Sequence, residues 1–427
     1  MILRLTDSYS RGLVVVAALL IGLWLSFFGL RAAIARYGYE GVTAERMKLA
    51  VSMEPDNPKY WDRLGQYQKQ NLLDRNQDSF RKAIALNPLD TNAWLDLATD
   101  YEMEGKNSEA REAYLQAKKS YPTSAEVAWR YGNFLLRQGD QPDAYAQLRR
   151  AIEGNPQLAA IAFSRAYRAN PDIDQILNQL LPANQTAYVG MINESAGENR
   201  LALAQIIWAH LLILRPHLEV RDFEPLVSKL MASGEYNAGR RVWDQGIATR
   251  NLPPLLQLDG SAVWDPSFES NINDQGFAWQ FKPIVQGVSI GYDKTEKHSG
   301  SQSLRLSFDG KHNPDLEAAC TFAAVQPRAT YLFSGWIKTK DITTEFGVGF
   351  RLHSYGTSGG SVVNTQQIFG NHPFTRIDQI WTAGADVRRV TICVTRAASD
   401  NPDVRISGTA WVDDVNLVPQ PAEPHTP

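Results

Sequence analysis

Hydrophobic and polar positions follow three different patterns along the 427 residues of this chain. Residues 12–30 contain no charged side chain, residues 43–251 carry apolar positions at helical spacing, and residues 257–418 alternate apolar and polar positions. A period of 3.6 residues indicates amphipathic helices, whereas alternation indicates half-buried strands. The pattern predicts a multidomain α + β protein with an apolar N-terminal helix, an α-helical solenoid and a C-terminal antiparallel β-sandwich.

The first segment, GLVVVAALLIGLWLSFFGL, is long enough to cross a bilayer as a helix. We expect it to be an uncleaved transmembrane anchor after a short tail at residues 1–11. A cleaved signal peptide is the alternative, because Ala33-Ile34-Ala35 has the small-x-small form of a cleavage site, although Arg31 precedes that site. Arginines and lysines flank both ends of the segment, so the charge count does not favour export of the bulk of the chain.

The helical region repeats itself. Windows that begin at Asn57, Thr91 and Ala125 stand 34 residues apart, and the second window is TNAWLDLATDYEMEGKNSEAREAYLQAKKSYPTS. Its first helix carries apolar side chains and its second helix carries small alanines that let helices approach, before Pro122 ends it. Two short helices cannot bury a hydrophobic face alone, so each pair is expected to stack on the next. The expected solenoid extends from residue 43 to residue 251.

These windows resemble tetratricopeptide repeats, whose period is 34 residues. The resemblance implies an inner groove, lined by the first helix of each pair, that holds a peptide or a partner protein. By the phase of the repeat, the groove candidates are Trp61, Gln68, Lys69, Leu95, Trp129 and Arg137. The alternative for the two tryptophans is an ordinary place in the core, because aromatic stripes at helical spacing are usually core.

The C-terminal region reads as a succession of strands separated by turn residues, which is typical of a β-sandwich. The segment AVWDPSFES, residues 262–270, is predicted to be its first strand. Further strands are predicted at residues 304–308, 331–339, 347–353, 388–396 and 409–418. The last nine residues, PQPAEPHTP (419–427), are too rich in proline for a core and are expected to form a disordered tail.

This region resembles the jelly-roll carbohydrate-binding modules of the CenC-like type. The matching residues are Phe268 and Glu269, then Trp279, the stretch HSGSQSLRLSF from His298, and AWVDDVNL from Ala410. The chain departs from the family where Asp265-Pro266-Ser267 replaces the usual asparagine and glycine. The resemblance implies a jelly-roll domain at residues 257–418.

Two sites follow from that resemblance. A structural calcium ion between the first and last strands would be held by Glu269 with Asp413 or Asp414, since calcium prefers carboxylate oxygens; the alternative is that these carboxylates cap turns or face solvent. Polysaccharide would stack on aromatic faces, for which the candidates are Trp279, Tyr292, Trp336 and Trp381. The alternative for each of them is a place in the core, which the need of a sandwich interior for large side chains favours.

Composition and missing motifs argue against several classes of function. A net charge of -3 gives no basic field for nucleic acid. Motifs for a nucleophilic serine, a zinc protease, a phosphate loop and a dinucleotide site are missing from the sequence, and the seven histidines are scattered. We therefore do not expect an enzyme; a glycan-processing enzyme with an unfamiliar site is the remaining catalytic alternative. Cys320 and Cys393 are either one disulfide or two buried thiols.

The hypothesis that combines these segments is a non-catalytic, membrane-anchored scaffold of the bacterial cell envelope, used in exopolysaccharide or surface-glycan assembly or export. The groove would dock a protein partner, the sandwich would bind polysaccharide, and residues 12–30 would lie in the inner membrane with the bulk on the periplasmic side. The alternative is an assembly protein whose sandwich has no ligand.

Overall fold

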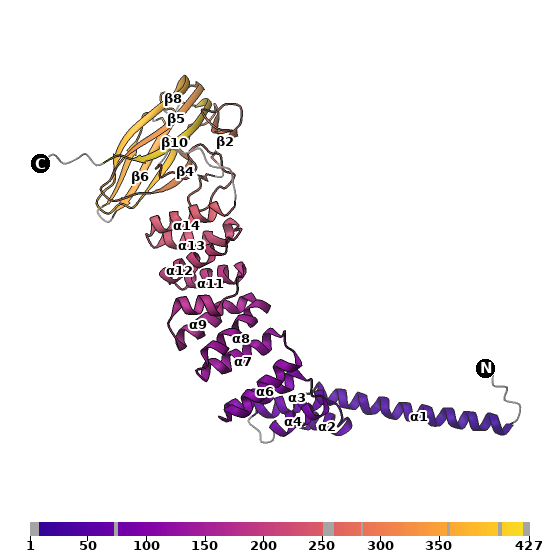
Figure 1. Cartoon of the computed structure of the whole chain (residues 1–427). Coiled ribbons are helices and arrows are strands. Elements are labelled where there is room, and N and C mark those ends of the chain that lie inside the picture. The colour runs from indigo at the N-terminus through magenta and orange to yellow at the C-terminus, as the bar shows by residue number, and fades with distance from the viewer. Residues whose placement is uncertain are drawn as a thin grey trace. The chain divides into compact units, whose positions relative to one another are not determined.

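The structure is a computed structural model of the chain, shown in Figure 1, and it describes residues 8–71, 76–250, 260–282, 285–356, 359–399 and 404–421. The chain divides into two compact units, Met1–Gly190 and Met191–Pro427. The predicted tails at 1–11 and 419–427 fall partly on residues 1–7 and 422–427, which lie outside the described residues. The predicted fold class is confirmed: a helical array of the tetratricopeptide type is followed by a two-sheet antiparallel β-sandwich.

The helices of the described residues follow one another along the chain. Their bounds are α1 Ser8–Tyr39, α2 Ala44–Met53, α3 Pro58–Gln70, α4 Asn76–Leu86, α5 Thr91–Met103, α6 Asn107–Ser120, α7 Ala125–Arg137, α8 Gln141–Gly154, α9 Ala159–Ala169, α10 Ile173–Leu180, α11 Gln185–Gly197, α12 Leu201–Ile213, α13 Val220–Ala232 and α14 Tyr236–Ala248, with a 3-10 turn at Pro156–Leu158.

Helix α1 is longer than the apolar segment that predicts it. The stretch Arg11–Tyr39 has a mean hydropathy of 2.6, and its most apolar window buries nothing against the rest of the unit. By length and composition this helix could cross a membrane, and a signal sequence passes the same test. The helix therefore agrees with both readings of the sequence.

The three predicted repeats are the helix pairs α3/α4, α5/α6 and α7/α8. Polar side chains cap the first helix of each pair: Asn57, Asp90 and Ser124 accept hydrogen bonds from main-chain N–H groups of the first turn. Glycine lets the two helices of a pair approach closely. A Cβ atom on Gly65 would lie 2.7 Å from the ring of Phe80, and one on Gly132 would lie 2.9 Å from Leu148. The repeat pattern thus specifies both the caps and the packing.

The sandwich consists of two five-stranded sheets. Its strands are β1 Gln280–Phe281, β2 Val288–Asp293, β3 Ser303–Asp309, β4 Leu316–Ala324, β5 Thr330–Ile342, β6 Gly349–Gly356, β7 Gly359–Asn364, β8 Gly370–Thr382, β9 Arg389–Arg396 and β10 Ser407–Pro419. One sheet has the order β1-β4-β9-β6-β7 and the other the order β2-β3-β10-β5-β8, and neighbouring strands are antiparallel. The inward side chains of both sheets form one buried core.

One predicted strand is wrong. Residues 262–270 form an irregular loop, because Asp265 turns the chain: its carboxylate accepts hydrogen bonds from the N–H groups of Glu269 and Ser270, both at 2.9 Å. Phe268 has a φ of 57°. The loop still belongs to the sandwich, since Val263 and Phe268 are completely buried in its core.

The last helix and the sandwich share a buried contact within Met191–Pro427. The indole of Trp243 in α14 is fully buried, with its ring centroid 5.1 Å from that of Trp264 and 6.5 Å from that of Phe277. The backbone makes room for it at Gly276, where a Cβ atom would lie 2.4 Å from the Trp243 ring and φ is 48°. Helix α14 is therefore part of the same packed body as the strands.

Cys320 on β4 and Cys393 on β9 stand directly opposite each other and form a disulfide. The sequence left open whether they are bonded. Their neighbours Ala319 and Val394 face the core, so the disulfide lies on the outer side of the sheet.

Candidate functional site

The first helices of the repeats line a polar groove in Met1–Gly190. Two adjoining cavities, of about 370 Å³ and 490 Å³, share Asn133, Arg137 and Arg165. We call them together the arginine pocket. Its charged lining is basic in excess: Lys69, Arg130, Arg137, Arg165 and Arg168 against Asp96 and Glu102.

Ion pairs fix several of these side chains. The guanidinium of Arg137 donates to both carboxylate oxygens of Glu102, at 2.6 and 3.0 Å. Arg130 pairs with Asp96 at 3.3 Å, and Lys69 donates to the carbonyl oxygen of Asp96 at 3.4 Å. Burial lowers the pKa of Lys69, while the charge of Asp96 opposes that change. The network joins α3, α5 and α7.

Trp129 forms part of the wall of the arginine pocket. Its ring lies under the guanidinium of Arg165, 4.8 Å from the ring centroid, and Arg165 also donates to Asn133 at 2.5 Å. Asn133 in turn donates to the carbonyl oxygen of Trp129 at 2.7 Å. These contacts hold a flat guanidinium in a fixed orientation at the mouth of the groove.

A second, larger cavity of about 830 Å³ has the opposite charge. We call it the acidic pocket; it is lined by Asp62, Asp90, Glu40 and Glu126 against Lys59 and Arg63, together with polar residues and Leu95. Burial, together with the negative charges of Asp96 and Asp90, raises the pKa of Asp62 to about 7. One buried oxygen of Asp62 has no hydrogen-bond donor among the described residues.

The groove residues predicted from the sequence meet only in part. Lys69, Trp129 and Arg137 line the arginine pocket, and Leu95, only 2% exposed, lines the acidic pocket. The remaining two point elsewhere. Gln68 accepts a hydrogen bond from Ser79 of α4, and Trp61 packs beside Phe80 and donates to the carbonyl oxygen of Pro55.

Asp62, Asp96 and Arg130 were missed, although the sequence carried a signal for them. They are 34 residues apart and occupy the same position in successive repeats, one residue after Trp61, Leu95 and Trp129. A charged residue at one repeat position in three consecutive units indicates a shared surface. Arg165 had no such signal, because α9 begins after the regular period has ended.

The aromatic candidates of the sandwich have different surroundings. Trp279 and Trp381 lie in the core, 1% and 4% exposed, so neither offers a face to a sugar. The interior needs their volume, and the Trp279 indole donates to the carbonyl oxygen of Asp265 at 2.6 Å. Tyr292 is half-buried, and its hydroxyl donates to Asn273 at 2.7 Å. Trp336 is half-buried on the outer side of β5 and stacks on the imidazole of His298 at 3.9 Å.

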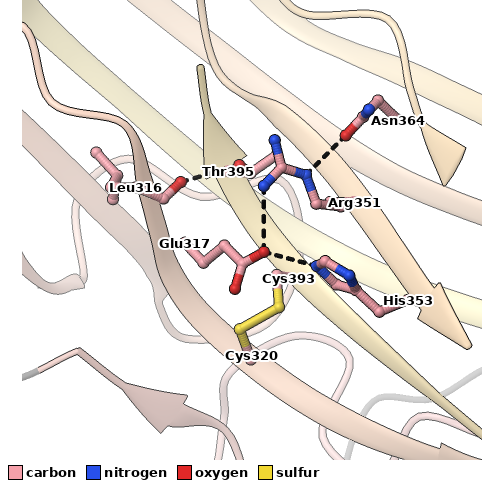
Figure 2. Close-up of a disulfide and its surroundings, with 8 residues drawn as sticks. All are labelled: Leu316, Glu317, Cys320, Arg351, His353, Asn364, Cys393 and Thr395. Carbon is pink, nitrogen blue, oxygen red and sulfur yellow. Dashed lines mark hydrogen bonds and ion pairs between the residues drawn. A yellow bond between two sulfur atoms is a disulfide. The ribbon is translucent and has the colours of Figure 1, made fainter. Parts of the chain in front are cut away.

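The outer side of the other sheet carries a polar cluster that the sequence did not reveal. Figure 2 shows Glu317, Arg351 and His353 converging beside the disulfide. His353 contacts one Glu317 oxygen at 2.6 Å, Arg351 donates to the same oxygen at 3.3 Å, and Arg351 also donates to Asn364 at 2.7 Å. Burial alone would raise the pKa of Glu317, but its hydrogen bonds with His353 and Arg351 outweigh burial and lower it.

An aromatic side chain extends this cluster. Tyr355 lies on β6 two and four residues after His353 and Arg351, and so on the same side of the sheet. It is 65% exposed, and its partner in β7 is Gly360, which has no side chain to cover it. We call Glu317, Arg351, His353, Tyr355 and Asn364 the outer-sheet site.

The three carboxylates predicted to hold calcium are occupied by protein donors. Asp413 is completely buried and accepts from the N–H groups of His298, Ser299 and Asp414 at 2.7 to 3.0 Å. Asp414 contacts His298 and the hydroxyl groups of Ser267 and Ser299, whereas Glu269 accepts from Ser301 and Gln302. Burial raises the pKa of Asp413 to about 7 in spite of its N–H donors.

Every oxygen of these carboxylates thus already accepts a hydrogen bond or contacts a histidine nitrogen. As they are placed, the residues do not fit a calcium ion, because in the described part of the chain the oxygens of Glu269, Asp413 and Asp414 do not gather within 4.8 Å of one another. Calcium stays a prediction of the sequence alone. Another group of ligand-type atoms, Glu317 with Cys320 and Cys393, has its sulfur atoms in the disulfide.

Comparisons with known proteins support the repeat assignment. A family model of the tetratricopeptide repeat matches residues 66–125 and 95–159, so the chain carries tetratricopeptide repeats. The protein O-mannosyl-transferase TMTC1 of Mus musculus is 28% identical over 100 residues, 22% of this chain and 11% of that protein. The human TMTC1 is 32% identical over 80 residues, 18% of this chain and 9% of that protein. The chain therefore spans only a small part of the length of these relatives.

Two solved structures are similar to different regions. The C-terminal family 22 carbohydrate binding module of Clostridium thermocellum Xyn10B is 13% identical with a TM-score of 0.28, over 38% of this chain and 96% of that one. Pseudomonas aeruginosa PilF is 18% identical with a TM-score of 0.26, over 44% of this chain and 89% of that one. At these scores nothing about a ligand or partner follows for this chain.

Proposed function

We propose that this chain is a non-catalytic, membrane-anchored scaffold of the bacterial cell envelope that docks a protein in its repeat groove and binds polysaccharide on its sandwich. The observation that carries the proposal is the bonded network of the groove. Lys69, Asp96, Glu102, Arg130 and Arg137 are held by one another at the mouth of an open cavity, which is the preorganised polar surface that a protein partner needs.

The polysaccharide half of the proposal rests on the outer-sheet site. Sugars bind where a flat aromatic face lies beside fixed hydrogen-bonding groups. Tyr355 supplies an exposed ring, while Glu317, Arg351, His353 and Asn364 hold one another in orientation. Tyr292 and Trp336, both on the opposite sheet, are the half-buried members of the four aromatic candidates.

The location in the cell is part of the proposal. Helix α1 would anchor the chain in the inner membrane, and the bulk would lie on the periplasmic side, where the disulfide is stable. From there the scaffold would serve exopolysaccharide or surface-glycan assembly or export. A reporter fused after Pro427 that is active in the cytoplasm would rule this topology out.

Protein docking is tested by photo-crosslinking in cells. A photoreactive amino acid in place of Trp129 is expected to trap a discrete partner, and the same amino acid in place of exposed Lys119, which lines neither pocket, is not. Equal trapping at both positions, or none at Trp129, would remove the docking role.

Polysaccharide binding is tested by calorimetry on the full chain in detergent, against a panel of bacterial polysaccharides. We expect saturable heat from at least one of them, lost in Tyr355→Ala and kept in Phe369→Ala, a control that also removes an exposed aromatic ring. If no polysaccharide gives heat, the second candidate function holds: a protein-assembly factor whose sandwich has no ligand. Burial of Trp279 and Trp381 favours that candidate, because it leaves the sandwich fewer aromatic faces.

A further inference from the structure

The arginine pocket carries positive charge that the chain itself does not neutralise. Arg137 forms an ion pair with Glu102, and Arg130 forms one with Asp96. Within the described part of the chain, Arg165 and Arg168 have no carboxylate partner. Arg165 donates to Asn133, and Arg168 donates to the carbonyl oxygen of Ser164. Both stand on α9, one turn apart, and line the same cavity as Arg137.

The positive charges of Arg137, Arg165 and Arg168 repel one another in this cavity. Burial lowers the pKa of Arg165, and the positive charges of Arg137 and Arg168 lower it further. The stack on Trp129 and the bond to Asn133 keep the guanidinium in place despite this repulsion. A bound anion would relieve it, and a planar guanidinium fork matches a carboxylate through two parallel hydrogen bonds.

The neighbouring acidic pocket restricts the class of molecule that can carry this anion. Nucleic acid and polyphosphate carry negative charge along their whole length, and the carboxylates of Asp90 and Glu126 would repel such a chain where it continues from the arginine pocket. A peptide, in contrast, can carry acidic residues at one end and uncharged or basic residues along the rest of its length. The net charge of -3 also gives no field that attracts nucleic acid.

We propose that the groove selects a peptide segment with clustered Asp or Glu side chains, which bind Arg137, Arg165 and Arg168. This inference rests on the proposed docking function and adds the chemistry of the partner. The segment lies with its acidic residues in the arginine pocket, and uncharged or basic residues continue toward the acidic pocket.

A random peptide library displayed on phage and selected on the full chain in detergent tests this inference. We expect the recovered peptides to be enriched in Asp and Glu at two or more neighbouring positions. Their affinity, measured by fluorescence anisotropy with the labelled synthetic peptides, should fall about tenfold in Arg168→Glu and should weaken with added salt. Lys119→Glu, which makes the same charge change at an exposed position outside the pockets, should bind as the native chain does.

Arg168 is the residue to change because it is exposed and, among the described residues, bonds to a main-chain oxygen rather than to a side chain, so the variant should fold. Circular dichroism and the melting temperature check that point. Recovered peptides that lack acidic residues, yet compete for the groove and lose affinity in Trp129→Ala, would overturn the acidic selectivity and leave the docking function intact. Peptides that bind Trp129→Ala and Arg168→Glu as well as the native chain would overturn both.

Discussion

The repeat groove and the sandwich use the same kinds of residue in opposite ways. In the groove, a half-buried tryptophan and several ion pairs lie beside open cavities, and Arg137 is 55% exposed. In the sandwich, Trp279 and Asp413 are almost or completely buried, and their polar atoms bond to main-chain groups of the same unit. Aromatic and acidic residues thus lie beside open cavities in the groove, whereas Trp279 and Asp413 stabilise the fold of the sandwich.

Substitution of tryptophan should separate these two uses most clearly. Trp279→Ala removes a buried indole and its hydrogen bond, and we expect it to lower the free energy of unfolding by about 3–5 kcal/mol. Trp129→Ala should lower it by less than about 2 kcal/mol, since this ring is half-buried, while weakening peptide binding. Thermal and denaturant unfolding of the full chain measure both; equal losses of stability would abolish the distinction.

The buried carboxylate gives the next largest effect. Asp413→Ala leaves three part-buried N–H groups, of His298, Ser299 and Asp414, without their acceptor, so we expect a loss of about 2–4 kcal/mol in unfolding free energy. Asp378→Ala is the matched control, because that carboxylate is exposed on β8 and pairs only with Arg376. A loss below about 1 kcal/mol at Asp413 would mean that water replaces the carboxylate.

In the groove, loss of the charge of Asp62 should stabilise the fold at high pH, because one of its buried oxygens has no hydrogen-bond donor among the described residues. The pKa of Asp62 is about 7 in the folded chain and lower in the unfolded chain, so the folded state holds a proton that the unfolded state has lost between pH of about 4 and 7. Stability therefore falls as the pH rises through this window. Asp62→Asn should raise the melting temperature by about 2–4 °C at pH 8 and change it little at pH 4.

Exposed Asp56→Asn is the control for that substitution and should show no pH-dependent gain. A lower melting temperature for Asp62→Asn at pH 8 would mean that the ionised Asp62 stabilises the groove.

Calcium should have the smallest effect. A calcium ion whose free concentration is a hundred times its dissociation constant would add about 2.7 kcal/mol to the unfolding free energy. Because the oxygens of Glu269, Asp413 and Asp414 already have partners, we expect millimolar calcium to move the melting temperature by less than about 1 °C relative to magnesium. A rise of several degrees with calcium alone would show that these carboxylates exchange their hydrogen bonds for a cation.

The sequence predicted the helical region well because a repeat converts spacing into position. The 34-residue period located α3 to α8, and it brought Lys69, Trp129 and Arg137 to one cavity. Asp62, Asp96 and Arg130 repeat with the same period, but they were not predicted to line the groove because the prediction started from aromatic residues. The period did not predict the position of Arg165, because its helix follows an irregular turn.

The sandwich was harder to predict, for a physical reason. Alternation separates the two sides of a strand but does not say which side is the core, so Trp279 and Trp381 could not be told from surface rings. The outer-sheet site joins β4, β6 and β7, and the pairing of β4 and β6 with β9 between them is set by topology rather than by local pattern. The loop at 262–270 resembled a strand because its apolar residues are buried, although Asp265 turns its backbone.

The buried indole of Trp243 limits how this chain can be rearranged during evolution. A recombination event between α14 and the strands would separate Trp243 from Trp264 and Phe277, leaving an apolar surface bare on each product. Such products would be prone to aggregate. The heritable module thus includes at least the sandwich and α14, and Phe223 of α13 packs on the same indole with the ring centroids 5.7 Å apart.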